Sequence, residues 1–203
     1  MSESARWAER YAATEMVWGL QPNPFVVETC SGYKPGRALD LGAGEGRNSL
    51  WLATQGWTVT AVDFVDLAIA RLNGRAAAEG LAVEALVADV LSYRPKPRSF
   101  DLVLLCYLQL PSVQRRRVLT SAAEALAPGG RLLLIAHDAA NIVSGYGGPR
   151  NPDLLTTADR VATALTQLGL TVTRAERRER EVAVDIGFRY ALDHVVEAVR
   201  PSS

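Results

Sequence analysis

The alternation of short apolar runs with longer helical patterns, which starts at Gly36, is the feature that most restricts the fold. Residues 37–41, 58–63 and 100–107 have the length and apolar content of buried strands. Longer segments with the period of amphipathic helices separate most of the runs, which is typical of a parallel sheet with helices on both faces. The sequence therefore predicts an α/β fold, a Rossmann-like three-layer α/β/α sandwich.

Capping and breaking residues give the other boundaries. Helices are expected over residues 47–55, from a cap at Asp66 to Gly80, over residues 113–126, and from a cap at Thr156 or Thr157 to Leu168. Further strands are expected over residues 83–88 and 131–136 and within residues 170–174 and 182–199. We expect the last two to form an antiparallel hairpin at the sheet edge.

The first 35 residues do not fit this alternation. They carry the bulky apolar residues Trp7, Tyr11, Met16, Val17 and Trp18, and a Pro-Asn-Pro sequence at residues 22–24 is expected to end the helix that contains them. Such a segment either caps the sheet or forms a lid over a ligand. We predict one domain over residues 1–203, with a helical cap or lid at 1–35 and an α/β core at 36–203.

Composition excludes several classes of protein. Lys plus Arg (22) balances Asp plus Glu (22), so the formal net charge is zero and tight binding of nucleic acid is disfavoured. No run approaches the roughly 18 apolar residues of a membrane span, and the charged N-terminus lacks the apolar core of a signal peptide. The two cysteines are far apart in sequence. We expect a cytoplasmic protein without disulfides, membrane association or a metal site.

A glycine-rich loop follows the first predicted strand. In an open parallel sheet the ligand lies beyond the carboxyl ends of the strands, and this loop is the usual contact. Residues 39–46 read Leu-Asp-Leu-Gly-Ala-Gly-Glu-Gly, so the glycine spacing is G-x-G-x-G. Glycine permits a tight turn at positive φ and close approach of a ligand to the backbone. Because nicotinamide and flavin enzymes use a similar turn, G-x-G-x-x-G, the loop alone leaves the ligand open.

Carboxylates in and after this loop indicate which class of ligand it binds. Asp40 precedes the first glycine and Glu45 lies between the last two, where their charge would repel a pyrophosphate but suit an amino group and a sulfonium. Asp63 ends the second strand, where it can accept hydrogen bonds from both ribose hydroxyls. Asp89 ends the third strand and can accept from an adenine amine. Singly, Asp40 or Asp89 is more typical of a loop cap; as a set, these sites suit an adenosine with a charged amino-acid tail.

These motifs, in this order, resemble those of class I S-adenosylmethionine-dependent methyltransferases. They comprise residues 39–47, Val62-Asp63, Ala88-Asp89-Val90 and residues 126–131. Residues 46–53 with Gly56, and the opening segment with Trp7, Tyr11, Trp18-Gly19 and Pro22-Asn23, are similar to the tellurite-resistance and thiopurine-type small-molecule branch. The resemblance implies a seven-stranded, mostly parallel sheet of order 3-2-1-4-5-7-6 with the last strand antiparallel, and S-adenosyl-L-methionine as cofactor.

The same resemblance implies a set of cofactor contacts. In chain order they are Tyr11, Trp18, Asp40, Gly42, Ala43, Gly44, Arg47, Asn48, Asp63, Phe64, Asp89, Val90 and Cys106. The glycine loop would contact the methionine portion, and Arg47 and Asn48 would lie near its carboxylate, helped by the helix dipole. Asp63 would bind the ribose, Phe64 the adenine face, and Asp89 with Val90 the adenine edge. Tyr11 and Trp18 would close over the cofactor, and Cys106 would line its pocket or be an inert buried thiol.

The acceptor side of the predicted site has fewer signals. Methyl transfer from a sulfonium is an in-line displacement, so positioning and exclusion of water can suffice. Thiols and chalcogen oxyanions need no base, whereas a phenol would benefit from one. His137, directly after the fifth strand, is the candidate base, or it bonds to its own loop; His194 is expected to be structural. Residues 144–152, with Tyr146 and Arg150, are the candidate acceptor-side loop.

The predicted function is therefore methyl transfer from S-adenosylmethionine to a small molecule, by a monomer or a homodimer. A non-catalytic cofactor-binding or sensor protein is one alternative, because methyl transfer needs no signature side chain. A nicotinamide-dependent oxidoreductase would be expected to have G-x-G-x-x-G without flanking carboxylates. An RNA or protein methyltransferase would be expected to have a basic face, or an Asn/Asp-Pro-Pro-aromatic motif where residues 106–111 read Cys-Tyr-Leu-Gln-Leu-Pro. The alternating Arg and Glu of residues 174–181 predict a solvated, salt-bridged strand face.

Overall fold

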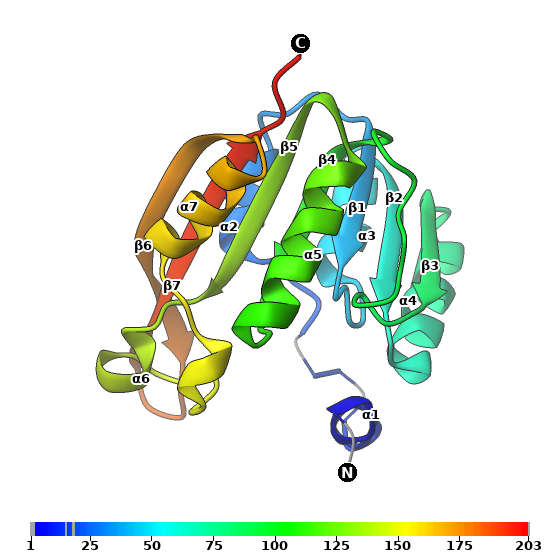
Figure 1. Ribbon diagram of the computed structural model, residues 1–203. Helices are drawn as coiled ribbons and strands as arrows, with labels where there is room; N and C mark the ends of the chain where they lie inside the picture. Colours follow the sequence, from blue (N-terminus) through cyan, green and yellow to red (C-terminus); the bar gives the residue numbers. More distant parts are fainter. Residues whose placement is uncertain (1–2, 15, 18, 203) are drawn as a thin grey trace. The chain divides into compact units, whose positions relative to one another are not determined.

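The computed structural model describes residues 3–14, 16–17 and 19–202 (Figure 1). In chain order its elements are α1 (Glu3–Ala12), α2 (Pro24–Cys30), β1 (Arg37–Leu41), α3 (Arg47–Thr54), β2 (Thr58–Asp63), α4 (Asp66–Glu79), β3 (Val83–Val87), β4 (Phe100–Cys106), α5 (Ser112–Ala125), β5 (Leu126–His137), α6 (Asn141–Ser144), the 3-10 helix η1 (Pro152–Leu154), α7 (Ala158–Gln167), β6 (Thr171–Ala183) and β7 (Phe188–Val199).

The strands form a seven-stranded sheet in the order β3-β2-β1-β4-β5-β7-β6, with β7 antiparallel to β5 and β6. This confirms the predicted Rossmann-like fold and sheet order. The chain divides into two compact units, Met1–Arg94 with Phe100–Leu104, and Pro95–Ser99 with Leu105–Ser203. The single domain over residues 1–203 stays a prediction.

The first unit contains the parallel half of the predicted alternation. β1 pairs in parallel with β2 and with β4, so that Leu39 lies opposite Thr60 on one side and Val103 on the other. β1 and β2 occupy the predicted residues, and Gly80 ends α4 in the left-handed conformation, as expected. The predicted cap at Asp66 is wrong: Val65 is the N-cap residue, without a side-chain bond, and Asp66 is already helical.

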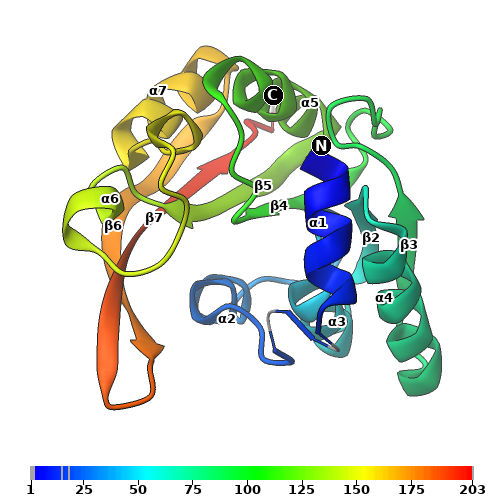
Figure 2. The same ribbon diagram turned by 90° about the horizontal axis from the view of Figure 1, so that it is seen from below.

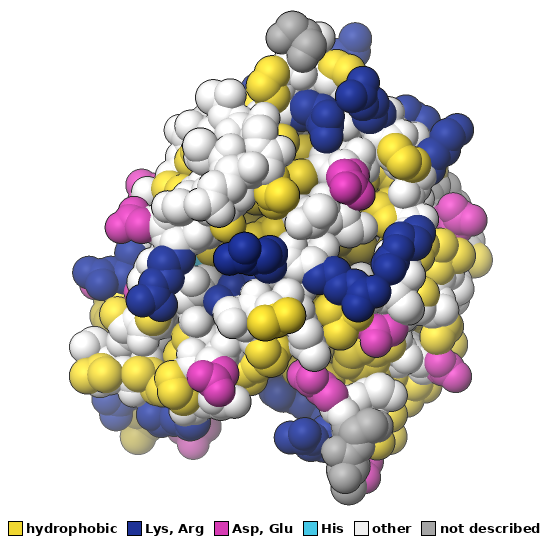
Figure 3. All heavy atoms as spheres, viewed as in Figure 1, with side chains coloured by type: hydrophobic (Ala, Val, Ile, Leu, Met, Phe, Trp, Pro, Cys, Tyr) yellow, Lys and Arg dark blue, Asp and Glu magenta, His cyan; other side chains and the backbone are white. Residues whose placement is uncertain are grey.

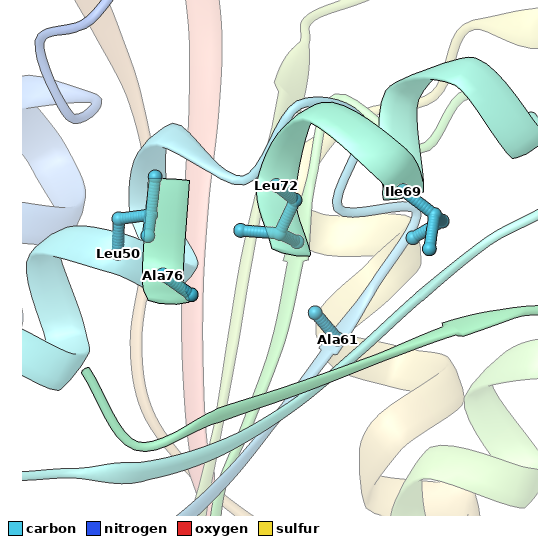
Figure 4. Close-up of a cluster of buried hydrophobic side chains, with 5 residues drawn as sticks. All are labelled: Leu50, Ala61, Ile69, Leu72 and Ala76. Carbon is cyan, nitrogen blue, oxygen red and sulfur yellow. The ribbon is translucent and has the colours of Figure 1, made fainter. Parts of the chain in front are cut away.

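A hydrophobic cluster joins α3, β2 and α4 in this unit (Figure 4). Its buried members are Leu50, Ala61, Ile69, Leu72 and Ala76. Leu72 is fully buried, so its truncation to alanine would cost roughly 2–5 kcal/mol. This packing fixes the helix that follows the glycine loop against the strand that ends at Asp63.

The N-terminal segment differs from its prediction. α1 ends at Ala12, well before the prolines, and the second proline begins a helix that the sequence analysis missed. Proline is favoured at the first helical position because its missing N–H has no partner there, and Asn23 caps α2 by accepting the N–H of Phe25 at 2.9 Å. Proline thus starts a helix here rather than ending one.

The second unit is built on β5 and the hairpin of β6 and β7. The predicted antiparallel hairpin is confirmed, and β6 forms the end of the sheet. Both β5 and β6 are longer than predicted, and β6 includes residues 174–181, whose charged side chains form ion pairs such as Arg174 to Glu176. Thr157 caps α7, one of the two predicted alternatives, by accepting the N–H of Arg160 at 3.4 Å.

Candidate cofactor site

The glycine loop leaves β1 through three glycines in the left-handed region, Gly42, Gly44 and Gly46, with φ of 78°, 56° and 77°. The N–H groups of Gly42 and Ala43 donate to the carbonyl oxygen of Val62 at 2.8 and 3.1 Å. The loop is therefore fixed to the carboxyl end of the neighbouring strand, as a ligand-binding turn requires.

Asp63 holds the next part of this loop. Its Oδ2 accepts the N–H of Gly44 at 2.9 Å, and its Oδ1 accepts the N–H of Val65 at 3.0 Å. Burial raises the pKa of Asp63, and the backbone hydrogen bonds from Val65, Gly44 and Phe64 oppose this rise. Each carboxylate oxygen has lone pairs left to accept further donors, and the side chain is half-buried. Asp63 therefore fits a ligand with two neighbouring hydroxyls, and its role in ribose binding stays a prediction.

Asp40 lies beneath the loop, with 1% of its surface exposed. The hydroxyl of Ser49 donates to its Oδ2 at 2.6 Å. Burial and the nearby charge of Asp63 raise the pKa of Asp40 to about 6, against the smaller opposing effects of Ser49 and Arg47. Asp40 was predicted to contact the cofactor. Its contacts favour a structural role instead, in which it holds the helix that contains Ser49 beneath the loop.

The charge of Glu45 is paired with a cation of the protein, which the electrostatic argument from the sequence did not foresee. The buried carboxylate forms an ion pair with Arg71 at 2.7 Å and accepts the N–H of Val17 at 2.9 Å. Arg71 also donates to the carbonyl oxygen of Tyr11 at 3.1 Å. Glu45 and Arg71 therefore attach the N-terminal segment to the glycine loop, a connection that no local sequence signal reveals.

Asn48 makes a second connection of this kind. The N–H of Asn23 donates to its Oδ1 at 2.9 Å, and both side chains are buried. Arg47, beside it at the start of α3, is half-buried. Their contact with the cofactor's carboxylate stays a prediction.

Tyr11 and Phe64 lie in one apolar cluster at the end of β2. Tyr11 is buried against Val65 and Ala68, and Trp7, Val17 and Phe64 pack on the same group. This cluster joins α1 to the start of α4 (Figure 2). The geometry supports an N-terminal cap over this strand end. The other predicted aromatic contact, Trp18, lies outside the described residues.

Asp89 and Val90 follow β3. Asp89 is exposed, and its Oδ1 accepts the N–H of Leu91 at 2.8 Å, which is the loop-capping alternative considered from the sequence. Val90 is buried. Oδ2 of Asp89 can still accept a hydrogen bond, so the contact of Asp89 with an adenine amine stays a prediction.

A cavity of about 370 Å³ also lies in this unit. Its lining residues are Met16, Glu45, Arg71, Gly74 and Arg75, which the predicted cofactor contacts do not include. The cavity therefore adds nothing to the cofactor assignment.

The second unit holds the remaining predicted residues, Cys106 and His137. Cys106 ends β4, is half-buried and forms no disulfide; its place in the cofactor pocket stays a prediction. His137 ends β5, and its Nδ1 lies 2.9 Å from Oδ1 of the fully buried Asp193. Asp193 was missed because it carries no local motif.

His194 and the loop after β5 complete the predicted acceptor side. His194 is fully buried, and burial lowers its pKa to about 4, which supports a structural role. Tyr146 is exposed in the loop after α6, and Gly148 of the same loop lies against the ring of His137.

Among the described residues no group of three or more histidine, cysteine, aspartate or glutamate side chains is arranged to hold a metal. No helix in that part of the chain is long and apolar enough to cross a membrane.

Comparison with known proteins relates the chain to a family. The family described as "Methyltransferase domain" matches residues 38–130, which include the glycine loop, Asp63 and Asp89. This match and the sheet order make the chain similar to the class I S-adenosylmethionine-dependent methyltransferases. S-adenosyl-L-methionine is the cofactor named for relatives of this kind.

Three curated relatives illustrate the range of the family. The 2-heptyl-1-hydroxyquinolin-4(1H)-one methyltransferase of Mycobacteroides abscessus is 29% identical over 147 residues, which cover 70% of this chain and 65% of that protein. The ribosomal RNA small subunit methyltransferase C of Alcanivorax borkumensis is 34% identical over 109 residues, 51% of this chain and 33% of that protein. TehB of Haemophilus influenzae, a probable S-adenosyl-L-methionine-dependent methyltransferase, is 38% identical over 65 residues, 32% of this chain and 23% of that protein. The chain thus spans less than two thirds of the length of each.

Solved structures share the fold. The N-methyltransferase NodS of Bradyrhizobium japonicum, in complex with S-adenosyl-l-homocysteine, has a TM-score of 0.74 at 22% identity and covers 98% of this chain and 100% of its own. The [4+2]-cyclase SpnF has a TM-score of 0.68 at 15% identity, over 88% of this chain and 79% of its own. At such identities the likeness concerns the fold alone.

Proposed function

We propose that the protein transfers the methyl group of S-adenosylmethionine to a small-molecule acceptor by in-line displacement. The contact between Gly44 and Asp63 carries the proposal, because it fixes the glycine turn and a half-buried carboxylate together at the ends of two adjacent strands. A carboxylate there suits ribose hydroxyls, and the turn suits a ligand that approaches the backbone. When bound, the cofactor supplies an activated methyl group, and the chain positions it and excludes water.

Calorimetric titration with S-adenosylmethionine, S-adenosylhomocysteine and NAD tests the cofactor. We expect micromolar binding of the first two and none of NAD. Asp63→Ala should weaken the binding of S-adenosylhomocysteine by roughly 100-fold, because hydrogen bonds to a charged group are worth about 1.5–3 kcal/mol each. Glu79→Ala, which removes the same charge from an exposed position at the other end of α4, is the matched control and should bind normally. Unchanged affinity in Asp63→Ala would contradict the ribose assignment.

A small-molecule acceptor is favoured over RNA. The formal net charge is zero, and on the face shown in Figure 3 the basic side chains form separate groups with acidic and apolar side chains between them. Binding of RNA draws most of its affinity from basic side chains on phosphates. The substrate in the name of the Mycobacteroides abscessus relative, 2-heptyl-1-hydroxyquinolin-4(1H)-one, is a suitable first acceptor to assay.

A cofactor-binding protein without methyl transfer is the second candidate function. SpnF, a [4+2]-cyclase of the same fold, supports this alternative, because the fold serves a different reaction in that protein. Turnover separates the two proposals: formation of S-adenosylhomocysteine that depends on an added acceptor supports the methyltransferase, and tight cofactor binding without any turnover supports the alternative.

A further inference from the structure

A buried polar cluster in the second unit joins four side chains from four segments of the chain. The hydroxyl of Tyr107 donates to Asp193 Oδ2 at 2.6 Å. Arg180 Nε donates to the same oxygen at 2.7 Å and to the Tyr107 hydroxyl at 2.9 Å. The other carboxylate oxygen lies 2.9 Å from His137 Nδ1. Asp193 is thus held on one oxygen and faces the histidine with the other.

The backbone at Tyr107 supports a functional reading of this cluster. Its φ is 57°, in the left-handed region, which is strained for a non-glycine residue. Its N–H donates to the carbonyl oxygen of Ile135 at 2.7 Å, and its ring lies 4.9 Å from that of His137. This strained backbone lies directly after β4, at the position from which the side chain of Tyr107 contacts Asp193. Strained residues of this kind cluster at functional sites.

His137 contacts the cluster with one edge of its ring, and 12% of its side chain is exposed. Nδ1 is buried 2.9 Å from Asp193 Oδ1, within ion-pair distance but outside hydrogen-bond geometry. Gly148 packs on the ring, because a Cβ there would lie 2.7 Å from Cδ2 and 3.0 Å from Nε2. A carboxylate at Nδ1 favours the tautomer with its proton on that nitrogen, which leaves Nε2 as the basic atom.

We propose that His137 is the general base for an oxygen acceptor, such as a phenol, an enol or an N-hydroxy group. Asp193 orients the imidazole, and Tyr107 and Arg180 are positioning residues that hold Asp193. This assignment rests on the proposed methyl transfer and narrows its acceptor class. Thiols and chalcogen oxyanions need no such base, so a protein that acted on them would have no use for the cluster in catalysis.

The proposed step balances in atoms and charge. His137 Nε2 takes the proton of the acceptor hydroxyl, and the acceptor oxygen forms the new bond to the methyl carbon. The bond between that carbon and sulfur breaks, its electron pair stays on sulfur, and S-adenosylhomocysteine leaves as a neutral thioether. The proton on His137 then passes to water, which restores the neutral ring.

The charges around His137 are compatible with this role. Asp193 and Arg180 offset one another, and burial raises the pKa of Tyr107 so that its hydroxyl stays neutral. His194, on the same strand as Asp193, is neutral above about pH 4. Asp193 is therefore the charged group of this cluster that faces the imidazole, at 2.9 Å.

Rates with matched acceptors test the assignment. We would assay the full chain with phenol, pentafluorophenol, thiophenol and 2-heptyl-1-hydroxyquinolin-4(1H)-one, and follow S-adenosylhomocysteine. His137→Gln should lower the rate with un-ionised oxygen acceptors roughly 100-fold or more, the usual effect of a general base. It should leave the rate with the ionised acceptors pentafluorophenolate and thiophenolate unchanged, and its affinity for S-adenosylhomocysteine should remain that of wild type.

Two further variants, assayed only in samples that circular dichroism shows to be folded, test the positioning role of Asp193. Asp193→Asn should reproduce the selective loss and shift the pH–rate profile, whereas the exposed hairpin residue Asp185→Asn is the charge-matched control and should change neither. If His137→Gln does not fold, as judged by circular dichroism, His137→Asn serves as the second variant. The pH–rate profile of the wild type with phenol must in either case show one basic group that is required in its neutral form.

Every result bears on the proposal. The role of His137 would be overturned if His137→Gln lowered the rate equally with all acceptors or did not lower it with phenol. It would also be overturned if the wild type methylated the thiol alone, or bound the cofactor without turnover of any acceptor. Failure of the wild type to bind S-adenosylhomocysteine would instead overturn the proposed function, so the two failures are distinct.

Discussion

Two buried aspartates, one in each unit, show how differently the two candidate sites are built. Asp40 in the first unit has 1% of its surface exposed and Asp193 in the second has 0%. Burial raises the pKa of Asp40 to about 6, and the nearby charge of Asp63 adds to this rise, while the hydrogen bond from Ser49 opposes it without cancelling it. For Asp193, burial is outweighed by His137, Tyr107 and Arg180, and its pKa lies below the ordinary value. Donors around a carboxylate, more than its exposure, decide which protonation state the fold favours.

The contrast extends to the sites themselves. The candidate cofactor site is centred on a short glycine loop, which backbone hydrogen bonds and Asp63 hold at the ends of β1 and β2. The cluster around Asp193 is made of side chains that come together only through the pairing of β5, β6 and β7. The first arrangement is specified locally, whereas the second depends on the register of the hairpin.

The largest expected effect comes from Asp193→Asn. Its amide leaves Arg180 without a charged partner in a buried cluster, and breaking such a pair typically costs about 3–5 kcal/mol. We expect a loss of about 3 kcal/mol or more in the free energy of unfolding at pH 7, measured by urea denaturation. A loss below about 1 kcal/mol would show that the cluster contributes little to the fold.

The effect of Asp193→Asn should depend on pH in a defined direction. A carboxylate whose native pKa is depressed contributes stability above its unfolded pKa, which is lost as pH falls through the native value. The difference between variant and wild type should therefore be largest above about pH 4, the ordinary pKa of aspartate, and shrink below it. Denaturation at several pH values checks this window, and a difference that grows on acidification would contradict it.

Gly46→Ala tests how strictly the cofactor loop is specified. The residue has φ of +77°, and an added Cβ would collide with the buried side chain of Leu72. Strain and overpacking together predict a loss of roughly 2–4 kcal/mol in the free energy of unfolding. Gly80→Ala is the matched control, because Gly80 has φ of +63° with nothing within 4 Å, and it should lose only about 1 kcal/mol. Equal losses would show that backbone strain alone explains the glycine.

The same contrast explains how far the sequence could predict the structure. Strands β1 and β2 and the loop between β1 and α3 were predicted at the right residues, because apolar runs and glycines encode them within a few positions. Tyr107 and Asp193 are 86 residues apart, and neither belongs to a motif, so their contact follows only from the folded sheet. Arg180 was hidden in a run of charges that otherwise forms a solvated strand face.

Asp40→Asn should act in the opposite direction from Asp193→Asn. A native pKa raised to about 6 means that the charged form opposes folding, so stability is lost as pH rises from about 4 to about 6. The neutral amide avoids this loss. We expect the variant to be more stable than wild type by roughly 2 kcal/mol at pH 7, and the gain to vanish near pH 3.5 in urea denaturation. Destabilisation at pH 7 would mean that the charge of Asp40 is better solvated than its burial indicates.

Tyr107→Phe should have the smallest effect, and it shows whether the cluster around Asp193 depends on all its donors. The variant keeps the ring beside His137 but removes one donor to Asp193 and one acceptor for Arg180 Nε. Because Arg180 still contacts Asp193 directly at 2.7 Å, we expect a loss of only about 1–2 kcal/mol in the free energy of unfolding. The pKa of Asp193, followed by NMR titration of the carboxylate, should rise towards its ordinary value, since Tyr107 is one of the groups that lower it. An unchanged pKa would assign the depression to His137 and Arg180 alone, and the tyrosine would then serve the histidine ring rather than the carboxylate.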